Sequence, residues 1–258
     1  VWALGSGYLF YRWLWRRCAG QAGIERPTAF LAAAIGGASE MAVLAERHGG
    51  RVDLVAAAHS LRVLIVVVGI PFAFQASGVH GSEPSATALQ AVHPGGLAAL
   101  AAATLAGVAL MSRTGLPNPF VLGSLFASMA LTGAGIELSA MPRGLSNAGQ
   151  LAIGVALGTR FDPSFRHAAP RWLGAVAVGT LVMIVVSGAF AWLLALATGL
   201  NPATLMLATS PGGIAEMCIT AKVLDPGVPT VTAFHVVRYL AVMVATRPMF
   251  RAEMARHR

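Results

Sequence analysis

Charged residues are scarce in this chain. Only 11% of its 258 residues are Asp, Glu, Lys or Arg, whereas 56% are hydrophobic. Soluble domains carry about one-quarter charged residues. The composition therefore excludes an ordinary soluble domain and predicts an integral membrane protein. Because one spanning helix needs about 20 apolar residues, the chain has room for roughly six to eight spans.

Cysteine and acidic residues are also rare. Cys18 and Cys218 stand alone, without metal-ligand spacing, so neither a disulfide framework nor a zinc site is predicted. Ten acidic residues against 18 Lys and Arg leave a net charge of +8. In a membrane protein this excess indicates cytoplasmic loops. We therefore expect no nucleic-acid partner, no cofactor and no bound metal, with the lipid bilayer as the surroundings.

Glycine and long apolar runs are what the chain has in place of charge. We predict an all-α integral membrane protein, a polytopic helical bundle, because long apolar segments alternate with short polar ones. The apolar segments cover roughly 1–15, 53–75, 95–112, 117–134, 146–159, 171–198 and 229–247, and Gly-rich stretches cover 30–45 and 205–222.

The chain also contains an internal duplication. The run from Gly36 to Arg62 aligns without a gap with the run from Gly212 to Arg238, an offset of 212 − 36 = 176 residues. Ten of the 27 aligned positions are identical, where composition alone would give roughly two or three. Both copies contain Gly-Gly near their start, so each Gly-rich segment is predicted to be an interrupted, re-entrant helix.

The loop charges predict that the two copies are inverted. The loops with Arg16, Arg26 and Arg47 are basic, whereas the loop from Ala76 to His93 has no Lys or Arg. Lys and Arg favour the cytoplasmic side, so the basic loops are expected inside and the 76–93 loop outside. The helix at 53–75 then runs outward and the helix at 229–247 runs inward. We expect a multi-pass protein of the bacterial inner membrane with a cytoplasmic C-terminus.

These patterns give four predicted regions. They are a first repeat at 1–75, an external loop at 76–94, a linking helix with the second repeat at 95–250, and a basic cytoplasmic tail at 251–258. The first repeat is expected to lack N-terminal spans, because counterparts of the segments near 115 and 149 would precede Val1.

Arginine and histidine recur at membrane depth in both copies. Arg62 lies nine residues after Asp53, about 13–14 Å along a helix and near the middle of a ~30 Å hydrocarbon core. An arginine there costs about 2.5–3.5 kcal/mol on insertion scales. His59 lies three residues before Arg62, as His235 does before Arg238, so each pair shares one helix face. The histidines are candidates for a packing role, a proton relay or a ligand contact.

Glutamates and small polar residues flank the predicted breaks. Glu40 and Glu216 follow the Gly-Gly pairs, and two interpretations remain open: an internal ion pair with an arginine, or a role in solute binding or proton coupling. Which Glu would meet which Arg is not defined by the sequence. The candidate substrate-binding or coupling residues are Glu40, Glu216, His59, His235, Arg62, Arg238, Gly36, Gly37, Gly212, Gly213, Ser39 and Ser210.

At these residues the chain resembles the AbrB family of bacterial membrane proteins. The resemblance rests on a duplicated Gly-Gly, Glu-Met and His-x-x-Arg pattern, which in the second copy follows Pro211 and in the first follows Ile35. The family is distinct from the soluble DNA-binding regulator of the same name. Its members carry the labels ammonia monooxygenase and regulator of gene expression, and the resemblance implies no settled mechanism.

Inverted repeats with paired interrupted helices are typical of secondary transporters with a site at the repeat interface. The sequence therefore favours a transporter or permease for a small anionic solute, with proton coupling as an option, rather than an enzyme. Two alternatives remain: a membrane oxygenase subunit and a non-catalytic membrane regulator. Homo-oligomer formation is also left open. A copper or iron site needs clustered ligands, and the seven histidines show no such spacing.

Overall fold

The computed structural model describes residues 2–20, 24–77, 91–115, 119–158, 170–224 and 227–256. In these ranges the regular elements are α-helices, and no strand occurs. They are α1 (Trp2–Cys18), α2 (Arg26–Ala33), α3 (Ala38–Arg47), α4 (Val52–Ser77), α5 (Pro94–Ser112), α6 (Pro119–Gly133), α7 (Arg143–Gly158), α8 (Pro170–Thr198), α9 (Pro202–Thr209), α10 (Ile214–Leu224) and α11 (Val228–Ala255). The all-α prediction is confirmed.

Four helices are long and apolar enough to cross a membrane. They are α4, α5, α8 and α11, and α6 is apolar but shorter. Large apolar side chains on these helices face outward: Phe120 is 74% exposed, and Val185 and Val244 are each 71% exposed. Such a surface is unfavourable in water, whereas lipid tails cover it without loss. The chain is a polytopic helical membrane protein.

The helices form two compact units. The first unit comprises Val1–Pro84 and Ala156–Arg258, and the second comprises Ser85–Val155. In the second unit α5 and α6 approach backbone to backbone, because a Cβ atom on Gly123 would lie 2.5 Å from Cα of Val108. Close contacts of this kind through glycine are typical of helices packed in lipid. In the second unit, which also contains most of α7, α5 and α6 are thus a helical pair held by small residues.

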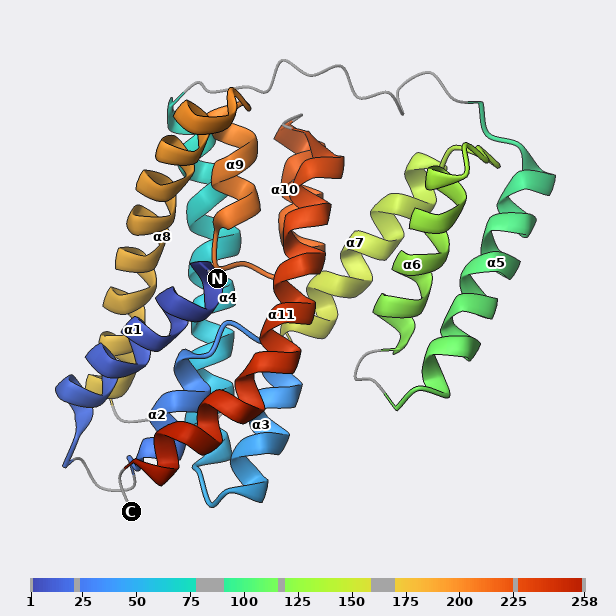
Figure 1. The fold of residues 1–258 in the computed structure, drawn as a ribbon. Helices are drawn as coiled ribbons and strands as arrows, with labels where there is room; N and C mark the ends of the chain where they lie inside the picture. The colour runs from blue at the N-terminus through green and yellow to red at the C-terminus, as the bar shows by residue number, and fades with distance from the viewer. Residues whose placement is uncertain are drawn as a thin grey trace. The chain divides into compact units, whose positions relative to one another are not determined.

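The first unit contains both copies of the duplication, and they run in opposite directions (Figure 1). In the first copy α2 rises from the lower end in the view, and α3 returns to that end before α4 crosses upward. In the second copy α9 descends from the upper end, and α10 returns there before α11 crosses downward. The two interrupted segments are therefore re-entrant, and the repeats are inverted, as the loop charges predicted.

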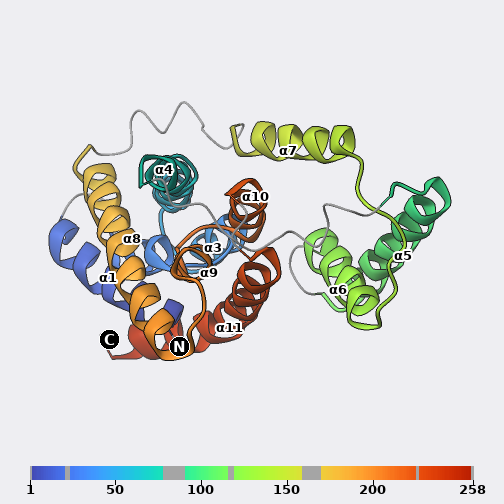
Figure 2. The same ribbon diagram turned by 90° about the horizontal axis from the view of Figure 1, so that it is seen from above.

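Packing around the re-entrant segments is tight. Seen from above, α9 lies between α8 and α11 (Figure 2). Trp172 at the start of α8 is fully buried, and its indole nitrogen donates a hydrogen bond to the carbonyl oxygen of Leu54 at 3.2 Å. This bond joins α8 of the second copy to α4 of the first. The core of the unit is thus shared between the two repeats.

Candidate functional site

The duplicated Gly-Gly pairs lie where the two re-entrant helices are interrupted. α2 ends at Ala33 and α3 begins at Ala38, whereas α9 ends at Thr209 and α10 begins at Ile214. The residues directly after the C-terminal ends of α2 and α9 have nearly the same backbone angles: φ −58°, ψ 133° for Ala34 and φ −61°, ψ 150° for Ser210. Both copies therefore break at equivalent positions, although only the second has a proline.

Arg62 of α4 reaches the first break and binds its exposed carbonyl groups. The guanidinium donates to the carbonyl oxygen of Ala34 at 3.1 Å and to that of Ala32 at 3.5 Å. The side chain is only 4% exposed. The last carbonyl groups of a helix have no partner within the helix, so Arg62 supplies the missing donors at the C-terminal end of α2.

Arg238 of α11 does the same at the second break. Its guanidinium donates to the carbonyl oxygen of Ser210 at 2.5 Å and also to that of Gly212. Ser210 is the counterpart of Ala34, since 210 − 34 = 176. The duplication thus repeats a hydrogen bond as well as a sequence. In both copies a cation lies at a helix C-terminus, where the helix dipole favours positive charge.

The two arginines are compensated by backbone oxygen atoms rather than by carboxylates. Across the described part of the chain, the ion pair within 4 Å joins Arg51 to Asp53 on the surface, at 2.5 Å. Glu216 is half-buried and near enough for its charge to act on Arg238, but it forms no such pair. The geometry around Glu216 therefore does not contain the internal ion pair that was one interpretation of the sequence.

The two histidines anchor the half-helices. The Nε2 atom of His59 lies 2.9 Å from the carbonyl oxygen of Leu31, and that of His235 lies 2.9 Å from the carbonyl oxygen of Leu207. Nδ1 of His59 accepts a hydrogen bond from Arg62 at 2.7 Å. Because arginine only donates, His59 is neutral and carries its proton on Nε2.

The second copy differs at its histidine. His235 is fully buried, and its Nδ1 atom has no hydrogen-bond partner in the residues that the structure describes. Arg238 instead donates from Nη1 to the carbonyl oxygen of Ser210 and from Nη2 to that of Gly212. We call each break, with its arginine and histidine, a half-site. In the second half-site the Nδ1 atom of His235 is therefore a buried acceptor, whereas in the first half-site the equivalent atom of His59 accepts from Arg62.

The glutamates and serines are placed less completely. The side chains of Ser39 and Glu40 lie outside the described residues, although both residues belong to the first turn of α3. The carboxylate of Glu216 lies against Gly213, where any Cβ atom would collide with it. Ser210 donates to the carbonyl oxygen of Leu207 at 2.9 Å, the local bond that serine commonly forms in helices.

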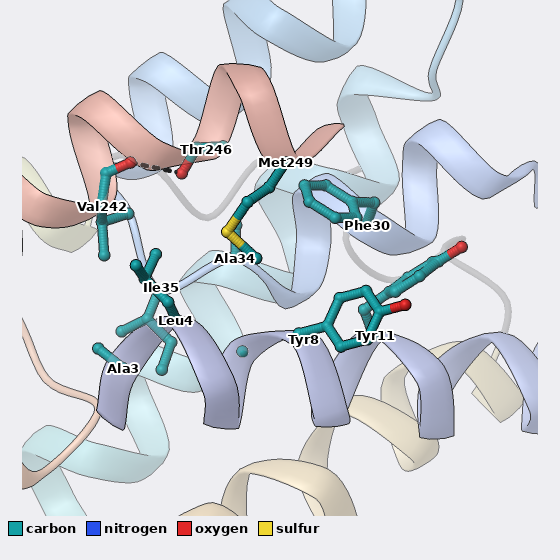
Figure 3. A pocket seen from close by; sticks show the side chains of 11 residues that line it. Ala3, Leu4, Tyr8, Tyr11, Phe30, Ala34, Ile35, Val242, Thr246 and Met249 are labelled. Atoms are coloured by element: carbon teal, nitrogen blue, oxygen red, sulfur yellow. Dashed lines mark hydrogen bonds between the residues drawn. The ribbon is translucent and has the colours of Figure 1, made fainter. Parts of the chain in front are cut away.

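The two half-sites lie near each other. Arg62 and Arg238 are close enough for their positive charges to repel. A small cavity of about 20 Å³, room for about one water molecule, adjoins the first break between α1 and α11. Figure 3 shows Ile35 of the break between Leu4 of α1 and Val242 of α11. Each repeat thus contributes one arginine to its own break.

Sequence reasoning missed a second polar cluster. Glu253 near the end of α11 is 4% exposed and accepts hydrogen bonds from the hydroxyl groups of Tyr8 at 3.0 Å and Tyr11 at 3.1 Å. The i, i+3 spacing of the two tyrosines on α1 was the available signal. The sequence predicts that Glu253 belongs to a basic tail, and nothing in the local sequence indicates its burial.

The described residues contain no group of three or more His, Cys, Asp and Glu side chains placed to hold a metal ion. The features present are two inverted, interrupted helices whose carbonyl ends are held by arginines, Arg62 buried and Arg238 half-buried. They define a polytopic α-helical membrane protein with a duplicated re-entrant core.

The chain belongs to the AbrB family, whose model is described as "Transition state regulatory protein AbrB" and matches residues 1–253. A relative is the protein named "Uncharacterized protein YhjN" from Bacillus subtilis strain 168. It is 25% identical over 265 residues, which cover 96% of this chain and 67% of the relative. No solved structure matches the chain significantly. The family resemblance given by the duplicated motif is confirmed.

Proposed function

We propose that the chain is a secondary transporter, or permease, for a small anionic solute that binds between the two interrupted helices. The observation that carries this proposal is the pair of arginines, Arg62 and Arg238, one from each repeat, each of which lies at the break of its own repeat. Two like charges in a low-dielectric interior attract an anion more strongly than the same charges in water.

The N-terminal ends of the second half-helices also favour an anionic ligand. α3 begins after Gly37 without a side-chain cap, so its first N–H groups remain as donors. The dipole of a helix places partial positive charge at this end, where anions are favoured. Inverted repeats with paired interrupted helices are also the architecture in which one fixed site can open alternately to each side.

Glu216 supplies a route to proton coupling. Its carboxylate lies close enough to act on Arg238, so its negative charge opposes binding of an anion beside that arginine. Protonation removes this charge and strengthens anion binding, and by linkage a bound anion then favours the protonated glutamate. We propose that the solute enters together with a proton on Glu216, and that Glu40 is its counterpart.

The test is thermal unfolding of the detergent-purified full chain with a panel of small inorganic and carboxylate anions. The wild-type protein should be stabilised by at least one anion, because a ligand at 100 times its dissociation constant adds about 2.7 kcal/mol. Arg238→Gln should abolish that shift. The matched control is Arg247→Gln, which removes an exposed arginine from the same helix and should leave the shift unchanged.

Glu216→Gln separates coupling from binding. This variant should retain anion binding, because it mimics the protonated glutamate, but the binding should no longer depend on pH. Flux into proteoliposomes should then lose its response to a proton gradient. If no anion stabilises the wild-type protein, or if folded Arg238→Gln protein transports normally, the anion site is wrong and the arginines only hold the breaks together.

A further inference from the structure

A second cavity, lined by arginine and apolar side chains, lies at one end of the first unit, away from the breaks. We call it the basic-end pocket, and its volume is about 740 Å³. It is open to the surface and lined by the end of α1, the start of α2, the residue after α3 and the end of α11. The residues that matter for its chemistry are Trp15, Arg26, His48, Phe250, Arg251 and Met254.

Charge in the basic-end pocket is predominantly positive. Arg26 and Arg251 line it from different helices, and the acidic residue in the lining is Glu25. The guanidinium carbon of Arg26 lies 5.0 Å above the ring centroid of Trp15. This contact uses the face of the guanidinium, while the N–H groups at its edge, one of them directed toward the hydroxyl group of Tyr11, can bind polar partners such as phosphate.

The remainder of the pocket is apolar. Phe250 is 3% exposed and packs edge-on against the ring of His48, with centroids 4.7 Å apart. Met254 and Trp15 add half-buried apolar surface. A free inorganic anion gains no binding free energy from apolar side chains of this kind. A ligand with a charged group joined to an apolar body would use both parts of the lining.

The position of the pocket indicates where that ligand comes from. The other arginines at this end of the unit are Arg16, Arg17, Arg47, Arg51, Arg171 and Arg256. Helices α4, α8 and α11, which are apolar enough to span a membrane, each begin or end here. The basic-end pocket therefore lies where the apolar part of the bundle gives way to charge, the depth of lipid headgroups.

We propose that the basic-end pocket binds the headgroup of an anionic phospholipid, with the phosphate between Arg26 and Arg251 and the glycerol region against Phe250 and Met254. Basic pockets between membrane helices are suited to such headgroups. This inference is independent of the proposed transport activity, because none of its residues belongs to the interrupted helices' breaks.

The experiment compares two lipids and one soluble phosphate on the full chain in detergent. Phosphatidylglycerol should raise the unfolding temperature by several degrees, whereas phosphatidylcholine and glycerol 3-phosphate should shift it little. Arg251→Gln, an exposed position on α11, should reduce the phosphatidylglycerol shift by at least half. Arg47→Gln removes an exposed charge at the same end but outside the pocket, and should retain the shift.

Native mass spectrometry provides the second readout, since it counts retained phosphatidylglycerol molecules even where a variant is less stable. Arg26→Gln and Arg251→Gln should each retain fewer than the wild-type protein. Equal effects of the two lipids, or an equal loss in Arg47→Gln, would overturn the proposal in favour of diffuse charge attraction. Stabilisation by glycerol 3-phosphate equal to that by phosphatidylglycerol would overturn the lipid source and leave a site for soluble organic phosphates.

Discussion

At the scale of the residue, two unfavourable features cancel one another at each break. A buried arginine in a membrane helix costs about 2.5–3.5 kcal/mol, and each unpaired carbonyl group in lipid costs several kcal/mol. Arg62 donates to Ala32 and Ala34, and Arg238 donates to Ser210 and Gly212. Each arginine therefore satisfies two carbonyl groups with part of its five N–H donors.

The histidines should contribute unequally to stability. His59 links two partners, Leu31 and Arg62, whereas His235 has Leu207 as its hydrogen-bond partner in the described residues. Because a hydrogen bond contributes about 1 kcal/mol net, His59→Phe should lower the free energy of unfolding by roughly 1 kcal/mol more than His235→Phe. Reversible unfolding in mixed micelles measures both values, and equal losses would contradict the difference between the half-sites.

The polar residues near the breaks could be picked out from the sequence, whereas their hydrogen-bond partners could not. Glu, His and Arg stand out because charge is rare at membrane depth. Apart from His59 beside Arg62, the partners of Arg62 and Arg238 are backbone oxygen atoms, which every residue has, so no sequence pattern marks them. Likewise the cluster of Glu253 with Tyr8 and Tyr11 joins the two ends of the chain, and only the tertiary fold brings them together.

At the scale of the element, the glycines and the capping arginine define the interruption more than proline does. The first break follows Ala34 with Ile35 in the next position, and its exit conformation matches that of the second break, which has Pro211. The carbonyl groups released at each break are bound by an arginine from the following long helix. The same local geometry thus arises from two different residues.

Pro211→Ala should therefore be mild. The expected loss is below about 1 kcal/mol, the size of the chain-entropy effect of one proline, because the first repeat forms its break without proline. Thermal unfolding of Pro211→Ala beside Arg238→Gln measures this, and the arginine variant should lose clearly more. A large loss in Pro211→Ala alone would mean that proline, not the arginine cap, holds the second break open.

Element boundaries were predicted well where hydropathy and hydrogen bonding agree. The run at 53–75 corresponds to α4, Val52–Ser77, but the run at 229–247 ends eight residues before α11 does, at Ala255. Charged residues and Pro248 end the apolar run, yet a helix needs backbone hydrogen bonds rather than apolarity to continue. Packing of Phe250 against Phe30 keeps the last turns of α11 on the bundle.

At the scale of the whole molecule, charge is divided between the two ends of the first unit. Arginines gather where α1, α3 and α11 end and where α2, α4 and α8 begin, whereas the opposite end contains Lys222 of α10. The inverted repeats could be predicted because the loops at one end are rich in arginine and those at the other end are not. The separation of Ser85–Val155 as a second unit could not, since its helices have the same apolar composition as the rest.

The charge division predicts the orientation in the membrane, because loops rich in arginine stay on the cytoplasmic side. Single cysteines can test it in a variant whose Cys18 and Cys218 are replaced by alanine. Leu200→Cys lies after the end of α8, and Ala255→Cys lies at the opposite end, on the last residue of α11; both positions are exposed. A membrane-impermeant maleimide should label position 200 in intact cells and position 255 only after lysis. The reverse labelling pattern would mean that the protein has the opposite orientation and that the basic-end pocket faces outward. Labelling of both positions in intact cells would contradict the inverted arrangement of α8 and α11.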